Sequence, residues 1–390
     1  MVSLLRGLIA LGSWIPMLAA CGVDPLPPAV VDAPPDWERI KRSTRPYVAL
    51  PSEYGMPYRQ PHSTLAWEDG MFISHDGLHM YAFYAPADLW QYSPYAAEYP
   101  DCPDITPFLR GPRLGMDLTT NPWGCPTVMH SDIAYAARNS TTEPFGPWKR
   151  TTMAFPARYE GGVHVLDNSD GTIDLVFSMS TEERANDLFW IRDIHHPPPP
   201  QDPTPLPAPI NTDGQEDNPH LERLDDKTLV LLFDNHGLED ASTTIKYALS
   251  HDDGKTWTTP RELGDTINAG PHDLTGHLYH DGHDWWLYFA SERSGALSIY
   301  RSRHVDPARM SSDFDQWGQP ELVIGPGDVL DHFGEVAGVG EPTLTSSGDI
   351  SFAVVYVSLT QATRYDRVDI DPWFLPKRSV STEKLPVDRQ

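Results

Sequence analysis

The fold can be inferred from the stretch HDGHDWWLYFASERSGALSIYRSR, which runs from His280 to Arg303. Its Asp281-Gly282 pair predicts a tight hairpin turn, because both residues tolerate a positive φ. An apolar, aromatic segment follows the turn, and a polar link leads from it into a second apolar segment. The pattern therefore predicts strand, turn, strand, link and strand. The side chains expected to pack between sheets are Trp286, Tyr288 and Ile299.

The same unit recurs along the chain. Its turns fall at Asp76-Gly77, Asp170-Gly171, Asp225-Asp226, Asp281-Gly282 and Gly348-Asp349. A third strand and, after a tryptophan, a fourth strand complete most units, at a spacing of roughly 55 to 65 residues. This pattern predicts an all-β fold, a β-propeller with four antiparallel strands in each blade. We expect five blades, with a six-bladed ring as the alternative. The last unit lacks a fourth strand, and residues 47–65 are the candidate to supply it and close the ring.

The composition limits the partners of the protein. The chain has 390 residues, a formal charge of −26 and 39 prolines. An acidic surface repels phosphate backbones, so we expect no nucleic-acid partner. The prolines belong mostly in loops, because proline breaks both helices and central strands.

The N-terminus reads as a targeting segment. A basic Arg6 precedes a short apolar run that ends in Leu18-Ala19-Ala20-Cys21. This ending resembles the lipobox of bacterial lipoproteins, which implies cleavage of residues 1–20 and lipidation of Cys21. An ordinary secretory signal is the alternative. The resemblance, with Gly22 after the cysteine, implies a lipid anchor in the bacterial cell envelope, with the outer membrane favoured on its periplasmic or surface face.

The rest of the chain divides into a tether, a domain and a tail. Residues 21–46 are rich in proline and predict an extended tether, 47–378 a single propeller domain, and 379–390 a tail. The first unit is longer than the others and carries Cys102 and Cys125. In an oxidising compartment these two cysteines predict a disulfide, with two buried thiols as the alternative.

Three resemblances bear on fold and function. Ser291, Arg293 and Gly295 resemble the repeat of the periplasmic propeller of the Tol system, which implies a propeller but no activity. The sequence SHDDGKTW, residues 250–257, resembles the Asp-box of sialidases, a structural hairpin. The sequence YRQP, residues 58–61, is similar to the sialidase element whose arginine grips a carboxylate, which implies that role for Arg59, although the usual isoleucine is missing.

The third resemblance is to five-bladed glycosidases of the arabinosidase and xylosidase type. The sequence EDGMFISHDGLHMYAF resembles their general-base motif, EDNPH their pKa-tuning motif and GEPTL their general-acid motif. The resemblance implies Asp69 as base, Asp217 as tuning residue and Glu341 as acid. Asp217 lies two units after the base instead of one, and GEP replaces the usual Glu-Gly-Pro order. Both departures put the triad in doubt.

Acids and histidines recur near the start of the first strand of the units, which predicts one polar channel mouth. The residues are Glu68, Asp69, Glu216, Asp217, Asp273, Glu341, His164, His220 and His272. Such a mouth is a ligand site, and its oxygens also suit a Ca²⁺ ion, with zinc at the histidines as an alternative. The first hypothesis is a membrane-attached propeller that binds a small molecule, a glycan or a protein. The second is a glycoside hydrolase, for which the three catalytic acids must converge; a sialidase-like enzyme is a further alternative.

Overall fold

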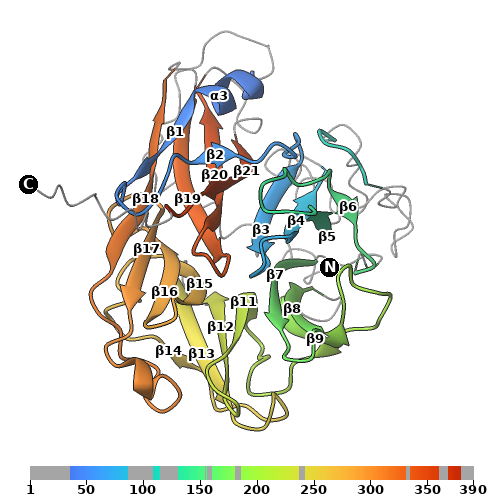
Figure 1. Cartoon of the computed structure of the whole chain (residues 1–390), viewed down its shortest axis with the longest axis vertical. Helices are drawn as coiled ribbons and strands as arrows, with labels where there is room; N and C mark the ends of the chain where they lie inside the picture. Colours follow the sequence, from blue (N-terminus) through green and yellow to red (C-terminus); the bar gives the residue numbers. More distant parts are fainter. Residues whose placement is uncertain are drawn as a thin grey trace, which may run out of the picture.

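Five antiparallel sheets are arranged around a common centre (Figure 1), which makes the fold a five-bladed β-propeller. The computed structural model describes residues 36–86, 109–114, 131–153, 155, 160–180, 186–236, 242–330, 334–359 and 368–378. The five-bladed prediction is confirmed, and the six-bladed alternative is wrong. The signal segment, the C-terminal tail and the three cysteines Cys21, Cys102 and Cys125 lie outside the described residues.

In blades 1 to 3 the four strands are neighbours in chain order, and in blades 4 and 5 one strand comes from the N-terminal segment. The inner strands are β3 (Trp67–Ile73), β7 (Glu160–Asp167), β11 (Gln215–Arg223), β15 (Asp273–His280) and β19 (Gly334–Leu344). The second strands are β4 (His79–Ala85), β8 (Ile173–Met179), β12 (Leu229–His236), β16 (Trp285–Ser291) and β20 (Ile350–Ser358). The third strands are β5 (Asp132–Ala137), β9 (Asp187–Ile194), β13 (Thr243–Ser250), β17 (Ser298–Arg303) and β21 (Val368–Leu375). The outer strands are β6 (Lys149–Arg150), β10 (Thr204–Pro205), β14 (Arg261–Glu262), β18 (Glu321–Val329) and β2 (Tyr58–Arg59). We number the blades 1 to 5 in the order of their inner strands.

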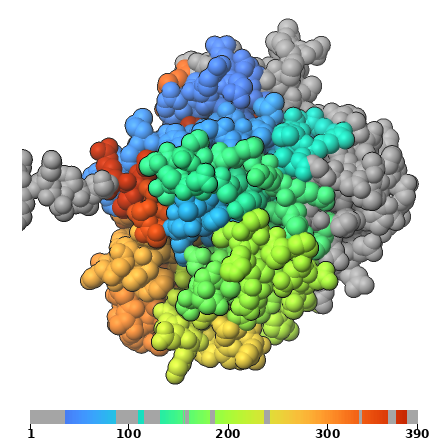
Figure 2. Space-filling view, turned by 45° about the vertical axis from the view of Figure 1, so that its right-hand side comes forward, coloured from blue at the N-terminus to red at the C-terminus, as the bar shows by residue number. Residues whose placement is uncertain are grey.

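The N-terminal segment closes the ring, as predicted. Strand β2 pairs with β21, with Tyr58 opposite Phe374 and Arg59 opposite Trp373, and so supplies the fourth strand of blade 5. Strand β1 (Thr44–Val48) pairs with β18 and adds a fifth strand to blade 4. Figure 2 shows the blue N-terminal and red C-terminal parts of the described chain adjoining on one side of the molecule. The closure pairs sheet edges that would otherwise be exposed.

Part of the expected tether is folded. Residues 37–43 form helix α3 (Trp37–Ser43), capped by the side chain of Asp36, which accepts a hydrogen bond from the Arg39 amide. Trp37 and Ile40 are three residues apart and are buried together. This segment is a helix and not an extended tether for two reasons. It follows the proline-rich run, and the apolar face of the helix packs against the propeller. Within the described ranges no helix has the length and apolar character needed to cross a bilayer.

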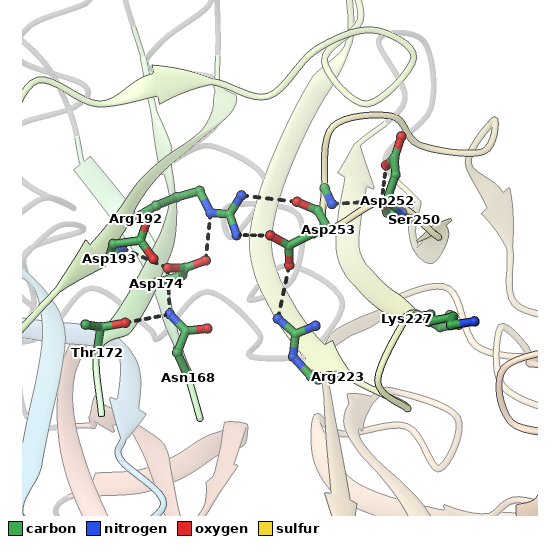
Figure 3. Close-up of polar contacts among 12 residues, drawn as sticks. Asn168, Thr172, Asp174, Arg192, Asp193, Arg223, Lys227, Ser250, Asp252 and Asp253 are labelled. Carbon is green, nitrogen blue, oxygen red and sulfur yellow. Dashed lines mark hydrogen bonds and ion pairs between the residues drawn. The ribbon is translucent and has the colours of Figure 1, made fainter. Parts of the chain in front are cut away.

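The Asp-box hairpin joins β13 to β14 within blade 3 and contacts Arg192 of blade 2 (Figure 3). None of its residues lines the central pocket. Asp253 pairs with Arg192 from β9 at 2.8 Å and with Arg223 from β11 at 3.2 Å. In the same turn the Ser250 hydroxyl donates to Asp252. The structural role predicted for this motif is confirmed.

Candidate functional site

Each inner strand carries a β-bulge at the same place, and one residue of each bulge has a positive φ. These residues are Gly70 (55°), Gly162 (48°), Asn218 (47°), Thr275 (53°) and Glu341 (54°). Glycine and asparagine tolerate this conformation, whereas threonine and glutamate adopt it at a cost. Strained residues of this kind gather at functional sites, so the part of the channel that the bulges surround is the candidate site.

The bulges surround one pocket. Each of the five inner strands contributes its bulge residue and the residue after it, and four of them contribute a third residue. The pocket lies in the centre of the propeller, and about 40 Å³ of it can be occupied by the centre of a water-sized molecule. Its polar wall includes Glu341 and Asn218 at one level and three histidines beyond them.

The predicted acids Asp69 and Glu341 meet directly. Glu341 accepts a hydrogen bond from the backbone N–H of Gly70 at 2.6 Å, and Asp69 accepts one from the indole of Trp67 at 3.2 Å. Burial raises the pKa of both carboxyls, and the adjacent charge of Asp69 raises the pKa of Glu341 further, well above its usual range. The two carboxyls are therefore in contact, and the raised pKa of Glu341 favours its protonated form beside Asp69.

Asp217 joins this pair at the same end of the channel. It accepts hydrogen bonds from the Asn186 side chain at 3.1 Å and from the Asn218 amide at 2.8 Å. A Cβ atom added to Gly162 would lie 3.0 Å from Asp217 Oδ1, so Asp217 lies against the neighbouring bulge. The pKa of Asp69 is raised mainly by burial and in smaller part by the charge of Asp217. The structure thus brings the three predicted catalytic acids together.

Asp234 is a fourth acid of this region that the sequence reasoning missed. It lies on β12 opposite Asp217 and is buried. Its two oxygens accept the Thr275 amide at 2.9 and 3.0 Å, and one of them accepts the Asn218 side chain at 2.9 Å. Burial, followed by the charges of Asp217 and Asp273, raises its pKa well above the usual range. In the sequence, Asp234 can be recognised only as a single acidic residue near the end of an apolar segment.

Three other predicted site acids have a structural role instead. They occupy equivalent positions, and each accepts a backbone N–H from a residue three or four positions earlier. Like Asp69 and Asp217, they are not among the residues that line the pocket. The pairs are Thr64 N with Glu68 Oε1 (2.8 Å), Thr212 N with Glu216 Oε2 (3.2 Å) and Gly270 N with Asp273 Oδ2 (2.7 Å). These hydrogen bonds hold the loop that enters each blade, as side-chain caps do in turns.

Arg59 and His272 also lie away from the pocket, contrary to prediction. Arg59 belongs to the outer strand β2, where its guanidinium pairs with Asp371 at 2.5 Å and with Glu38 at 3.3 Å. The Arg59 guanidinium therefore pairs with carboxylates of blade 5 and of α3. It does not face the pocket, where the sialidase-like role of binding a ligand carboxylate would need it. The Nδ1 atom of His272 lies 3.4 Å from the Thr243 hydroxyl, beside the start of β15.

Three histidines occupy the channel beyond the acids. His164 and His220 were predicted there. His277 holds the equivalent position in blade 4, two residues after Thr275, but His272 was predicted instead. Each ring accepts a backbone N–H from the next blade. The hydrogen bonds are Leu221 N to His164 Nδ1 (3.3 Å), Leu278 N to His220 Nε2 (3.0 Å) and Leu344 N to His277 Nε2 (3.1 Å).

These hydrogen bonds determine whether the expected cation fits. A neutral imidazole that accepts at one nitrogen carries its proton on the other, so the second nitrogen of each ring is an N–H donor. A metal ligand needs a lone pair at that nitrogen. The histidines therefore do not fit zinc. Ca²⁺ would need carboxylate and carbonyl oxygens instead, and those of Asp217 and Asp234 accept protein N–H groups.

Comparison with known proteins supports the fold. No family model matches the sequence, and no curated protein matches it. The catalytic domain of the family GH62 α-L-arabinofuranosidase from Coprinopsis cinerea has a TM-score of 0.50 at 8% identity, covering 86% of this chain and 98% of that one. The α-L-arabinofuranosidase PaAbf62A from Podospora anserina, in complex with cellotriose, has a TM-score of 0.47 at 9% identity, covering 86% and 98%. At these identities the likeness establishes the five-bladed fold and nothing finer.

Proposed function

We propose that the protein is a glycoside hydrolase of the arabinosidase or xylosidase type, acting at the acidic end of the channel. The observation that carries the proposal is the protonated carboxyl of Glu341 in the pocket wall, beside Asp69 and Asp217. Cleavage of a glycosidic bond needs a carboxylic acid kept protonated by its surroundings and a second, ionised carboxylate. The propeller shared with the arabinofuranosidase from Coprinopsis cinerea supports the same class.

The contacts favour an exchange of two of the predicted roles. Glu341 remains the general acid. Asp69 is hydrogen-bonded to it, which leaves no space for a sugar and a water between the two, whereas inverting hydrolysis uses carboxyls about 6.5–9.5 Å apart. Asp69 therefore suits the tuning role, since its charge keeps Glu341 protonated. Asp217, which lies across Gly162 from that pair, suits the general base, and Asn186 orients its carboxylate.

The experiment compares Glu341→Gln and Asp217→Asn on aryl α-L-arabinofuranosides and aryl β-D-xylosides. We expect both variants to lose about 10²- to 10⁴-fold in kcat. A dinitrophenyl leaving group needs no protonation, so it should restore much of the activity of Glu341→Gln and none of that of Asp217→Asn. Asp226→Asn, in an exposed hairpin turn, is the control. Unchanged activity in both variants, or no turnover by the folded wild-type protein, would contradict the proposal.

A binding protein without activity is the second candidate. It is favoured by one observation, that Asp69 and Glu341 satisfy each other and the other acids accept hydrogen bonds from the protein itself. A shift of the melting temperature with arabino- or xylo-oligosaccharides, in the absence of turnover, would favour this candidate. In either case we propose a lipid anchor at Cys21 in the bacterial cell envelope, which metabolic labelling with a fatty acid tests: Cys21→Ser should lose the label.

A further inference from the structure

A ring of hydrogen bonds between blades surrounds the channel. The residue two positions after each bulge faces the next blade, and these residues are Phe72, His164, His220, His277 and Thr343. The Thr343 hydroxyl accepts the Ile73 amide at 3.1 Å, as the three histidines accept the amides already described. Phe72 cannot accept, and its ring packs edge-on against His164 with centroids 4.6 Å apart. The histidines are thus the acceptors that join blades 2 to 5.

This arrangement leaves one nitrogen of each ring as an N–H donor. The protons must lie on His164 Nε2 and on Nδ1 of His220 and His277. Burial and the neighbouring histidines lower the pKa of all three rings well below the usual value, so the rings stay neutral. His164 Nε2 and His220 Nδ1 are buried and have no hydrogen-bond partner among the described residues. An unsatisfied buried donor destabilises the folded protein, which favours a guest that accepts a hydrogen bond.

The three rings lie close enough for one guest to contact all of them. The three rings offer nitrogen atoms within 4.8 Å of one another, and all three rings line the central pocket. A water molecule would accept two of the N–H groups and bring two hydrogens of its own that need acceptors. A monatomic anion accepts all three and brings no donor. We infer that the histidine ring of the channel is a binding site for a small anion of the size of chloride.

The inferred anion site does not depend on the proposed hydrolase function. It can be tested without measuring enzyme activity. Crystals grown in sodium bromide should show an anomalous difference peak between the three histidines. In solution, chloride or bromide should raise the melting temperature by about 2 °C or more relative to sodium gluconate at the same ionic strength. His220→Phe places in blade 3 the side chain that blade 1 carries naturally, and it should lose both effects. His283→Gln, on the exposed turn between β15 and β16, should keep both.

Three outcomes would overturn the inference. The first is a folded wild-type protein with neither a bromide peak nor a halide-dependent melting temperature. The second is a stoichiometric zinc or nickel ion between the histidines, found by elemental analysis and by anomalous diffraction at the metal edge. The third is stabilisation by acetate but not by bromide, which would assign the donors to a carboxylate instead. The bromide peak is measured on the wild-type protein, so a folding defect in His220→Phe would leave the test intact.

Discussion

Glu341 in blade 5 accepts the backbone N–H of Gly70 in blade 1 at 2.6 Å, and its carboxyl, whose pKa is raised, lies against that of Asp69. This contact joins the first and last inner strands, so the acid pair lies at the seam where the ring closes. A polar contact that helps to close the fold therefore also places the proton that the proposed reaction needs. The first prediction follows from that proton.

Glu341→Gln should change how stability depends on pH. The folded-state pKa of Glu341 is raised, so the wild-type protein loses stability as the pH rises from about 5 toward the folded-state pKa. Glutamine cannot ionise, so the Glu341→Gln variant does not lose stability in this way. The free energy of unfolding of the variant, relative to wild type, should therefore increase as the pH rises above about 5 in urea titrations. Parallel curves for the two proteins would contradict the protonated state of Glu341.

Gly162→Ala tests the close approach of the bulges. Gly162 has a φ of +48°, and an added Cβ would lie 2.9 Å from the Asn218 amide nitrogen. The matched control is Gly171→Ala, at a φ of +85° with no atom within 4 Å of the new Cβ. We expect the control to lose about 1 kcal/mol and Gly162→Ala about 3 kcal/mol or more, because only the latter adds a clash to the strain. Equal losses in urea unfolding would show that the bulges can separate freely.

Asp174 and Asp253 both pair with Arg192 and provide a test of burial (Figure 3). The Asp174 side chain is 1% exposed and also accepts the Asp193 amide at 3.0 Å, whereas the Asp253 side chain is 49% exposed. We expect Asp174→Asn to lose about 2–3 kcal/mol and Asp253→Asn less than about 1 kcal/mol. Chemical denaturation of the two variants measures the difference. A larger loss in Asp253→Asn would mean that the exposed pair carries the contact between the blades.

The buried side chain of His62 should make the stability of the folded protein sensitive to acid. It is buried against Trp148 with ring centroids 4.6 Å apart, and burial, with a smaller contribution from Arg138, lowers its pKa to about 3. Below about pH 6.5 the unfolded chain takes up a proton that the folded chain does not, so stability falls by up to about 1.4 kcal/mol per pH unit from this group. The stability of the His62→Phe variant should fall less steeply than that of the wild type between about pH 6.5 and pH 4. His283→Gln, whose side chain is 83% exposed, should match the wild type.

Several features were predictable because they depend on short stretches of chain. The Asp-Gly turns, the five units and the Asp-box each involve residues within a few positions of one another. The missing fourth strand could be assigned to the N-terminus because an open ring would expose sheet edges. Helix α3 was missed because its helical form depends on burial of Trp37 and Ile40 against the propeller.

The site was predictable only in part. Asp69, Asp217 and Glu341 were found through motifs, but the sequence does not distinguish them from Glu68, Glu216 and Asp273, which hold loops. Residues one position apart on a strand point to opposite faces, and a bulge shifts that alternation. A bulge is a local shift of strand pairing that residue patterns do not show. The roles of neighbouring acids therefore stayed undefined until the strands were paired.

The sequence by itself determined the strands, the turns and the number of blades, because these follow from the local alternation of apolar segments and turn residues. Only the tertiary structure decided which side chains share the channel. His164, His220 and His277 lie more than fifty residues apart in the chain and meet because three blades place the same bulge around one axis. The tautomer of each ring depends on a backbone amide from the next blade, and such a contact exists only once the ring is closed.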